Sequence, residues 1–171
     1  MKYLVPPISL FVLMFSFLGC GSSSDLPVVS SVDINKYAGK WYEIASFPIG
    51  AQKGCSCTTA EYTVTKEGYI TVYNRCLKNG EVSDITGKAF PVEGSGNAKL
   101  KVQFFWPFKA DYWIIDLDKE YQYAVVGHPS RDYLWILSRT PIMNDSTYSA
   151  ITARVKNLGY DLSRLKKTTH I

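Results

Sequence analysis

Apolar and polar residues alternate in short segments from Trp41 onward, and these segments recur about every ten residues. Polar turns, several with glycine, separate them, which is typical of an antiparallel β-sandwich or barrel. The pattern predicts eight strands, at Gly39–Phe47, Thr58–Thr65, Tyr69–Leu77, Val82–Phe90, Ala98–Trp106, Asp111–Asp116, Tyr121–Gly127 and Tyr133–Arg139. Eight antiparallel strands can close around one small ligand. We therefore expect an all-β fold, an eight-stranded antiparallel up-and-down β-barrel.

The period of the pattern changes after the last predicted strand. Pro141 interrupts the alternation, Asn144 or Asp145 can cap a helix that runs to about Leu158, and Gly159 occupies the C′ position. One face of this helix is apolar and comprises Tyr148, Ile151, Val155 and Leu158, while Arg154 and Lys156 lie outside it. We expect this C-terminal α-helix to pack on the outside of the barrel.

The alternation also assigns side chains to the two faces of the sheet. In the fifth predicted strand, Lys99, Lys101 and Gln103 must face solvent, so the alternate positions point inward. A hairpin closed symmetrically about Glu67 sets Tyr62 opposite Val72. The inward set that results comprises Ala60, Tyr62, Val64, Ile70, Val72, Asn74, Ile85, Gly87, Ala89, Leu100, Val102, Phe104 and Trp106, to which we add Tyr112.

Several of these inward residues are small, where a sealed core would use leucine or isoleucine. A vacant apolar space with a few polar groups suits a lipid tail. The sequence thus predicts ligand contacts from Ala60, Tyr62, Ile70, Val72, Asn74, Ala89, Val102, Phe104 and Tyr112; the alternative for each is ordinary core packing. Lys53, Arg75 or Lys109, near the loops, are candidates for contact with a phosphate or carboxylate head group.

The first thirty residues differ from the rest of the chain. Lys2 precedes an apolar run, 10–18, which ends at Gly19 and Cys20, the pattern of an export signal. The run is too short for a permanent membrane span. We divide the chain into a signal peptide, 1–19, a flexible tether, 20–31, and one domain, 32–171, since the 46% hydrophobic content suits a single core.

The charge of the chain is mild. The net charge of +4 falls to about +3 once Lys2 leaves with the signal, and no run of four or more Lys or Arg appears. This argues against nucleic acid as a partner. Lys166 and Lys167 form a solvated end or, alternatively, touch anionic head groups.

Three cysteines follow Cys20, at positions 55, 57 and 76. The predicted hairpin sets Thr58 opposite Cys76, so a disulfide from Cys76 to Cys55 or to Cys57 needs a register shift or bulge. A metal site at Cys55 and Cys57 is disfavoured, because the only two histidines lie far off in sequence.

Three motifs resemble the lipocalin family. The first is Asn35, Gly39, Trp41, Tyr42 and Glu43 at the start of the first strand. The second is Arg131-Asp132-Tyr133, similar to a Thr-Asp-Tyr motif, and the third is Arg139 at the end of the barrel. The runs 132–141 and 104–108 are similar to bacterial lipocalins, so the chain resembles the bacterial outer-membrane lipoprotein and apolipoprotein D branch.

This resemblance carries structural expectations. It implies a lipocalin calyx in which Trp41 plugs the floor, Arg139 lies over its ring in a cation–π contact, and Gly39, Asp132 and Tyr133 complete the signature. It places Tyr133 and Trp135 inside, which adds both to the predicted ligand contacts. Related bacterial lipocalins suggest Cys55 as the partner of Cys76.

Gly19-Cys20 resembles the bacterial lipoprotein box, which implies acylation of Cys20. The alternative is an ordinary secreted protein cleaved nearby. Gly21 at the next position implies sorting to the outer membrane, so the expected location is the bacterial outer membrane, with the N-terminal lipid anchor as the membrane contact.

The sequence contains none of the catalytic motifs Gly-x-Ser-x-Gly, His-Glu-x-x-His or a phosphate loop. His128 precedes Pro129 in a predicted surface turn, and Glu43 is a candidate buried carboxylate. We therefore predict a binding protein and no enzyme, with no metal and no cofactor. The resemblance to bacterial lipocalins implies that the ligand is a fatty acid, lysophospholipid or related amphiphile, held during envelope stress or lipid turnover, and a homodimer is left open. The alternatives are an enzyme on the same scaffold or a structural envelope lipoprotein without a ligand.

Overall fold

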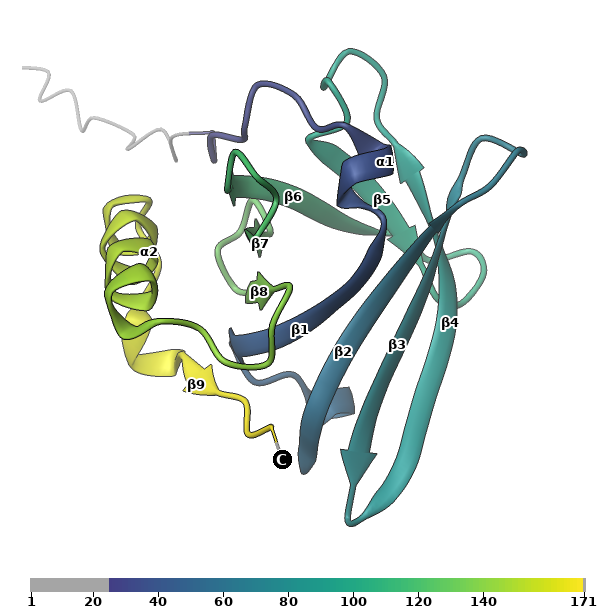
Figure 1. Cartoon of the computed structure of the whole chain (residues 1–171). Coiled ribbons are helices and arrows are strands. Elements are labelled where there is room, and N and C mark those ends of the chain that lie inside the picture. Colours follow the sequence, from purple (N-terminus) through teal and green to yellow (C-terminus); the bar gives the residue numbers. More distant parts are fainter. Residues whose placement is uncertain (1–24, 171) are drawn as a thin grey trace, which may run out of the picture.

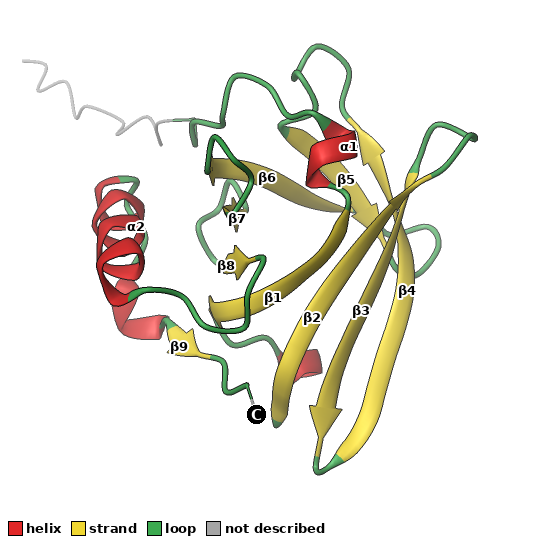
Figure 2. Ribbon diagram, viewed as in Figure 1, coloured by secondary structure: helices red, strands yellow, loops and turns green. Residues whose placement is uncertain are grey.

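The structure is a computed structural model, and it describes residues 25–170. Eight antiparallel strands form a closed barrel (Figures 1 and 2). They are β1 (Gly39–Ser46), β2 (Cys55–Val64), β3 (Ile70–Lys78), β4 (Glu81–Pro91), β5 (Lys99–Gln103), β6 (Ala110–Leu117), β7 (Tyr123–Gly127) and β8 (Leu134–Ser138). Neighbours in sequence pair along the sheet, β8 pairs with β1, and β1 pairs with β2 from Gly39–Tyr62 to Tyr42–Thr59, which closes the barrel.

Short helices and one longer helix accompany the barrel. They are α1 (Ile34–Tyr37), α2 (Asp145–Asn157) and the 3₁₀ turns η1 (Gly50–Gln52) and η2 (Leu162–Arg164). Asn144 caps α2 by accepting a hydrogen bond from the Ser146 backbone N–H, and Gly159 follows the helix at φ +87°. The sequence left Asn144 and Asp145 open as the cap, and the structure selects Asn144.

The predicted strand register is confirmed at the β2–β3 hairpin, where Tyr62 lies opposite Val72. Three predicted boundaries are wrong by two residues or more. β2 begins at Cys55 and not at Thr58. β5 ends at Gln103 because the chain turns at Phe105–Phe108, where the Phe108 N–H donates to the Phe105 carbonyl. Trp106 therefore loses the strand's parity and is 86% exposed instead of inward. β7 begins at Tyr123, because Tyr121 has φ +58°, outside the extended region.

Two hydrophobic clusters lie on opposite faces of the sheet. One lies inside the barrel and includes Trp41, Val72 and Leu100. The other joins α2 to the outer face of β1, β7 and β8, through Ile151 and Val155, which are both fully buried. Figure 1 shows α2 beside the barrel, next to the ends of β6, β7 and β8. No helix in residues 25–170 is long and apolar enough to cross a membrane.

The predicted signal peptide and Cys20 lie outside the described residues. The part of the predicted tether that is described, 25–31, is packed against the barrel and is not a free linker there. Leu26 is 2% exposed in the cluster under α2, and the Val29 N–H donates to the Ile114 carbonyl at 3.0 Å. The flexible-tether prediction is wrong for this segment, because its apolar residues find a buried place that the composition does not reveal.

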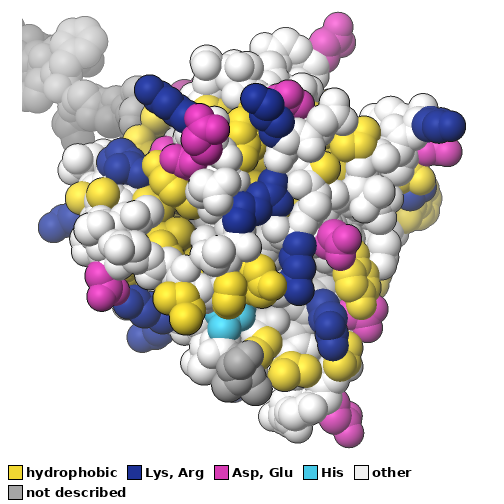
Figure 3. Space-filling model, viewed as in Figure 1, with side chains coloured by type: hydrophobic (Ala, Val, Ile, Leu, Met, Phe, Trp, Pro, Cys, Tyr) yellow, Lys and Arg dark blue, Asp and Glu magenta, His cyan; other side chains and the backbone are white. Residues whose placement is uncertain are grey.

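The C-terminal end also departs from expectation. Lys166–Lys167 forms a short strand, β9, that pairs with Ala45 and Ser46 of β1, although both lysines stay exposed. The following residues continue along the barrel, with the Thr168 N–H donating to the Ile44 carbonyl and the Cys57 N–H to the Thr169 carbonyl. This tail lies where β1 and β2 no longer pair. Over α1, β1 and β2, the surface mixes basic, acidic and hydrophobic side chains (Figure 3).

Candidate ligand-binding site

One end of the barrel is closed by Trp41, which has no exposed surface. The Arg139 guanidinium carbon lies 3.7 Å from the centroid of the Trp41 rings, which confirms the predicted cation–π contact. The Trp41 Nε1 donates to the Tyr37 carbonyl at 2.8 Å. Gly39, at φ +92°, starts the strand in a conformation that favours glycine.

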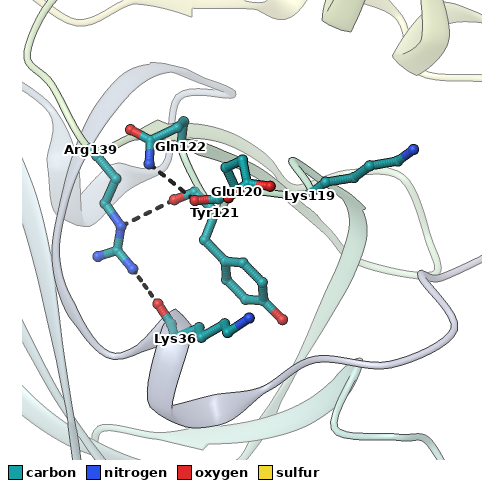
Figure 4. Close-up of a pocket in the computed structure, with 6 residues that line it drawn as sticks. All are labelled: Lys36, Lys119, Glu120, Tyr121, Gln122 and Arg139. Carbon is teal, nitrogen blue, oxygen red and sulfur yellow. Dashed lines mark hydrogen bonds between the residues drawn. The ribbon is translucent and has the colours of Figure 1, made fainter.

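Arg139 also ties the floor to its surroundings. Its guanidinium nitrogens donate to the carbonyls of Lys36, Tyr37, Ala38, Lys40 and Tyr121, at 2.7–3.3 Å. Figure 4 shows this guanidinium between the Lys36 and Tyr121 carbonyls, in a groove of about 310 Å³ on the outer side of the floor. The guanidinium is therefore committed to the backbone of α1 and its neighbours.

Three tyrosine hydroxyls meet just above the floor. Tyr112 Oη lies 2.7 Å from Tyr37 Oη and 2.8 Å from Tyr62 Oη. Burial raises the pKa of Tyr62 to about 12, and it holds the pKa values of Tyr37 and Tyr112 well above the ordinary value. All three groups are therefore neutral hydroxyls near neutral pH. We call them the tyrosine triad.

The predicted ligand contacts divide into two layers. Five have little accessible surface: Tyr62 (4%), Ile70 (4%), Val72 (2%), Ala89 (0%) and Val102 (8%). The others keep part of their surface accessible: Ala60, Asn74, Phe104, Tyr112 and Trp135 are half-buried, and Tyr133 is 43% exposed. Ala60, Phe104, Tyr112 and Trp135 also pack against the interior cluster.

Small inward residues leave less room than the sequence suggests. A Cβ added at Gly87 would come within 2.7 Å of the Phe104 ring and of the Gln103 carbonyl, so Phe104 already occupies the space beside this glycine. Val64, which alternation turns inward, is 43% exposed because the end of β2 extends past the floor. The prediction that Val64 lines the interior is wrong.

Aromatic side chains mark the open end. Tyr133 stacks on Trp135 with ring centroids 6.2 Å apart, and His128 packs edge-on against Tyr133. The Trp135 Nε1 donates to Gln52 Oε1 at 3.5 Å, and Gln52 Nε2 donates to the Glu43 carboxylate at 2.8 Å. Gln52 thus joins Trp135 to the wall of the barrel.

Glu43 is buried, as suspected, and its carboxylate is fully engaged. It accepts hydrogen bonds from Ser46 (3.0 Å) and Thr168 (2.6 Å) in addition to Gln52. This arrangement connects β1, η1 and the C-terminal tail. It gives Glu43 a structural role.

A disulfide joins Cys55 to Cys76, the pairing implied by the family resemblance. The required register shift is present: β2–β3 pairing jumps between Ser56 and Thr59, and Cys57 lies in the bulge at φ +50°. Cys57 is the free cysteine of residues 25–170. It lines an outer groove of about 350 Å³ with Arg75 and His170, among others.

The three proposed head-group contacts remain apart from the interior. Lys53, Arg75 and Lys109 are exposed, and the Lys109 ammonium lies 4.2 Å from the Phe90 ring centroid. Sequence reasoning missed Tyr37 and Gln52, which lie in helical turns outside the alternating segments. Within residues 25–170, no group of three or more His, Cys, Asp or Glu is placed to hold a metal ion.

Comparison with known proteins decides the family. A lipocalin-like domain model matches residues 32–170. The chain is a lipocalin. It is 40% identical over 163 residues to "Outer membrane lipoprotein Blc" of Vibrio cholerae, covering 92% of this chain and 95% of that protein. It is 42% identical over 153 residues to "Temperature-induced lipocalin-1" of Arabidopsis thaliana, covering 84% and 82%.

Apolipoprotein D of Bos taurus is 34% identical to the lipocalin over 154 residues, covering 85% of this chain and 80% of that protein. These relatives place the chain in the branch that its motifs indicated. Among solved structures, insecticyanin of the tobacco hornworm Manduca sexta superimposes with a TM-score of 0.71 at 22% identity, covering 86% of this chain and 85% of that one. That likeness supports the fold.

Proposed function

We propose that this lipocalin binds an amphiphilic lipid, a fatty acid or lysophospholipid, inside the barrel while it is anchored to the bacterial outer membrane. The observation that carries the proposal is the contrast between a sealed floor and accessible inward side chains above it. Ala60, Phe104 and Trp135 pack against the interior cluster and keep part of their mainly apolar surface accessible. Burial of apolar surface, at roughly 25 cal/mol per Å², is the driving force for an acyl chain in such a place.

Binding can be followed through Trp135. Its ring borders the interior, whereas Trp106 is 86% exposed in the β5–β6 loop and reports on solvent. Titration of the Trp106→Phe variant with lysophospholipid at micromolar concentration should shift and enhance the tryptophan emission. The same titration of a Trp106→Phe, Trp135→Phe variant should show little change. Flat titrations with several lipid classes would favour a barrel without a ligand, and release of a reaction product would favour an enzyme.

The anchor is a separate part of the proposal. It rests on Gly19-Cys20 in the sequence and on relatives that are named outer membrane lipoproteins. Growth of cells with radioactive palmitate should label the wild-type chain, and the label should be absent from Cys20→Ala. Label that persists in Cys20→Ala, or no label in the wild type, would rule out acylation at this residue.

A further inference from the structure

The tyrosine triad contains more hydrogen-bond donors than its own contacts use. Each phenol carries one O–H hydrogen, and the two contacts, Tyr37–Tyr112 and Tyr62–Tyr112, consume two of the three. One O–H is therefore left to donate to a group outside the triad. A buried donor without a partner is costly, so this hydrogen marks a place where a ligand oxygen or a water is favoured.

The position of the spare donor follows from accessibility. Tyr37 and Tyr62 are 2% and 4% exposed, whereas Tyr112 is half-buried and borders the accessible upper layer. When Tyr37 and Tyr62 both donate to Tyr112, the Tyr112 O–H is the one left over. This hydrogen-bond arrangement leaves the spare donor on Tyr112, the residue of the three that keeps the most accessible surface.

The surroundings select a neutral acceptor. Along the described strands, the inward positions carry no lysine, arginine or histidine. Arg139, the cation next to the floor, is already bound to five backbone carbonyls and the Trp41 ring. A carboxylate or phosphate at the bottom of the barrel would be buried without a countercharge, which is strongly unfavourable. A hydroxyl or carbonyl oxygen carries no such cost.

We propose that the barrel selects amphiphiles that carry a neutral oxygen, a hydroxyl or a carbonyl, at the end that enters first, and that Tyr112 donates the hydrogen bond to it. This proposal rests on the proposed lipid-binding function and names the class of ligand for the same site. A plain hydrocarbon end would leave the Tyr112 donor without a ligand partner. The ionised head group then stays at the mouth, in water.

Matched pairs of ligands test the selection. Lauric, palmitic and stearic acids are each compared with their ω-hydroxy counterparts by displacement of a fluorescent fatty acid at neutral pH. Three chain lengths are compared so that, in one of them, the terminal hydroxyl of the ω-hydroxy acid lies at the depth of the tyrosine triad. Because a hydrogen bond contributes about 0.5–1.5 kcal/mol, we expect the best-fitting ω-hydroxy acid to bind the wild type about 3- to 10-fold more tightly than its plain partner.

Two variants with the same chemical change separate the role of Tyr112 from a general effect on packing. Tyr112→Phe removes the accessible donor, so the preference for the ω-hydroxy acid should vanish while plain acids still bind. In Tyr37→Phe, the two remaining hydroxyls make one contact and still leave one O–H to donate, so the preference should persist. Urea unfolding of both variants checks that each is folded.

The outcomes are distinguishable. Equal affinities within every pair in the wild type, or a preference that survives Tyr112→Phe, would overturn the selection while leaving lipid binding intact. Failure of both plain and ω-hydroxy acids to bind would overturn the proposed function and the selection together.

Discussion

The floor and the mouth of the barrel are built from the same strands, yet their side chains differ in accessibility. At the floor, Trp41, Ala89 and Leu100 have no exposed surface. Next to Trp41 along the sheet, Ala60 pairs with it, and Ala60 and Asn74, which lie opposite each other on β2 and β3, remain half-buried. The difference lies in what covers each end: α1 and Arg139 close the floor, whereas at the mouth β1 and β2 diverge. Strand alternation decides which way a side chain points. The elements that close each end of the barrel decide whether that side chain is packed.

Polar groups follow the same division. At the floor, the Trp41 indole and the Arg139 guanidinium have hydrogen-bond partners. Above it, within residues 25–170, the Asn74 carboxamide has no hydrogen-bond partner, although it points inward from β3. Satisfied groups stabilise a fold, whereas groups left open inside a barrel are available to a ligand.

The sharpest test of this contrast replaces one tryptophan at each end. Trp41→Ala should lower the free energy of unfolding by about 3–5 kcal/mol, because a fully buried ring and its hydrogen bond are lost. Trp135→Ala should cost about 1–2 kcal/mol, since part of that ring is already accessible. Urea unfolding measures both. Equal losses would show that the two ends are equally packed.

The disulfide tests whether the mouth depends on a covalent restraint. Replacing Cys55 and Cys76 together by serine should lower the free energy of unfolding by about 3 kcal/mol, as expected for a loop of this length, since the sequence separation of the two positions is 21. Cys57→Ser is the matched control and should change it little. A loss of similar size in Cys57→Ser would contradict the assignment of Cys57 as the free cysteine.

Alkaline pH tests the burial of the tyrosine triad above the floor. Burial raises the pKa of Tyr62 to about 12, against about 10 in the unfolded chain, which corresponds to about 3 kcal/mol. The folded state holds this proton more tightly, so the stabilisation is complete below pH 10 and is lost as the pH rises toward 12. Urea unfolding between these pH values should show the loss. In Tyr62→Phe, which has no hydroxyl at this position to ionise, the decline should be shallower.

The smallest effect is expected at an exposed ion pair. Lys101 Nζ lies 2.7 Å from Asp111 Oδ1, and although burial alone would raise the pKa of Asp111, hydrogen bonds from Lys101 and Trp113 and the Lys101 charge lower it. Asp111→Asn should cost less than about 1 kcal/mol near neutral pH. Its contribution is present above the unfolded pKa and is lost as the pH falls through the lower folded pKa. Acid unfolding curves of the two proteins should therefore converge at low pH.

Much of the fold could be predicted from local pattern. Alternation located eight strands and placed Tyr62 opposite Val72, and helical spacing with a cap located α2. Predictions failed where the backbone leaves the strand period, as at Trp106 after the Phe105 turn and at Tyr121. The packing of residues 26–29 could not be predicted either, because their partners lie far away in sequence.

The candidate site was predicted less completely than the fold. Strand alternation gave the direction of most of the predicted contacts, and the family resemblance gave that of Tyr133 and Trp135. Neither gave their depth, so residues as different as Ala89 and Asn74 fell into one list. Tyr37 was missed because it belongs to α1, a single turn without a repeating pattern. The triad that it forms with Tyr62 and Tyr112 brings together three separate elements.

The sequence by itself determined the period of the strands and the helix after Pro141, because each depends on neighbouring residues. Its motifs carried the family resemblance, and that resemblance implied the Trp41–Arg139 pair. Only the tertiary structure decided which inward residues are sealed, that Phe104 lies against Gly87, and that Tyr112 stands between two other hydroxyls. These features depend on how distant strands curve and close. A side chain's depth and its partners are set by that closure, and no local pattern contains it.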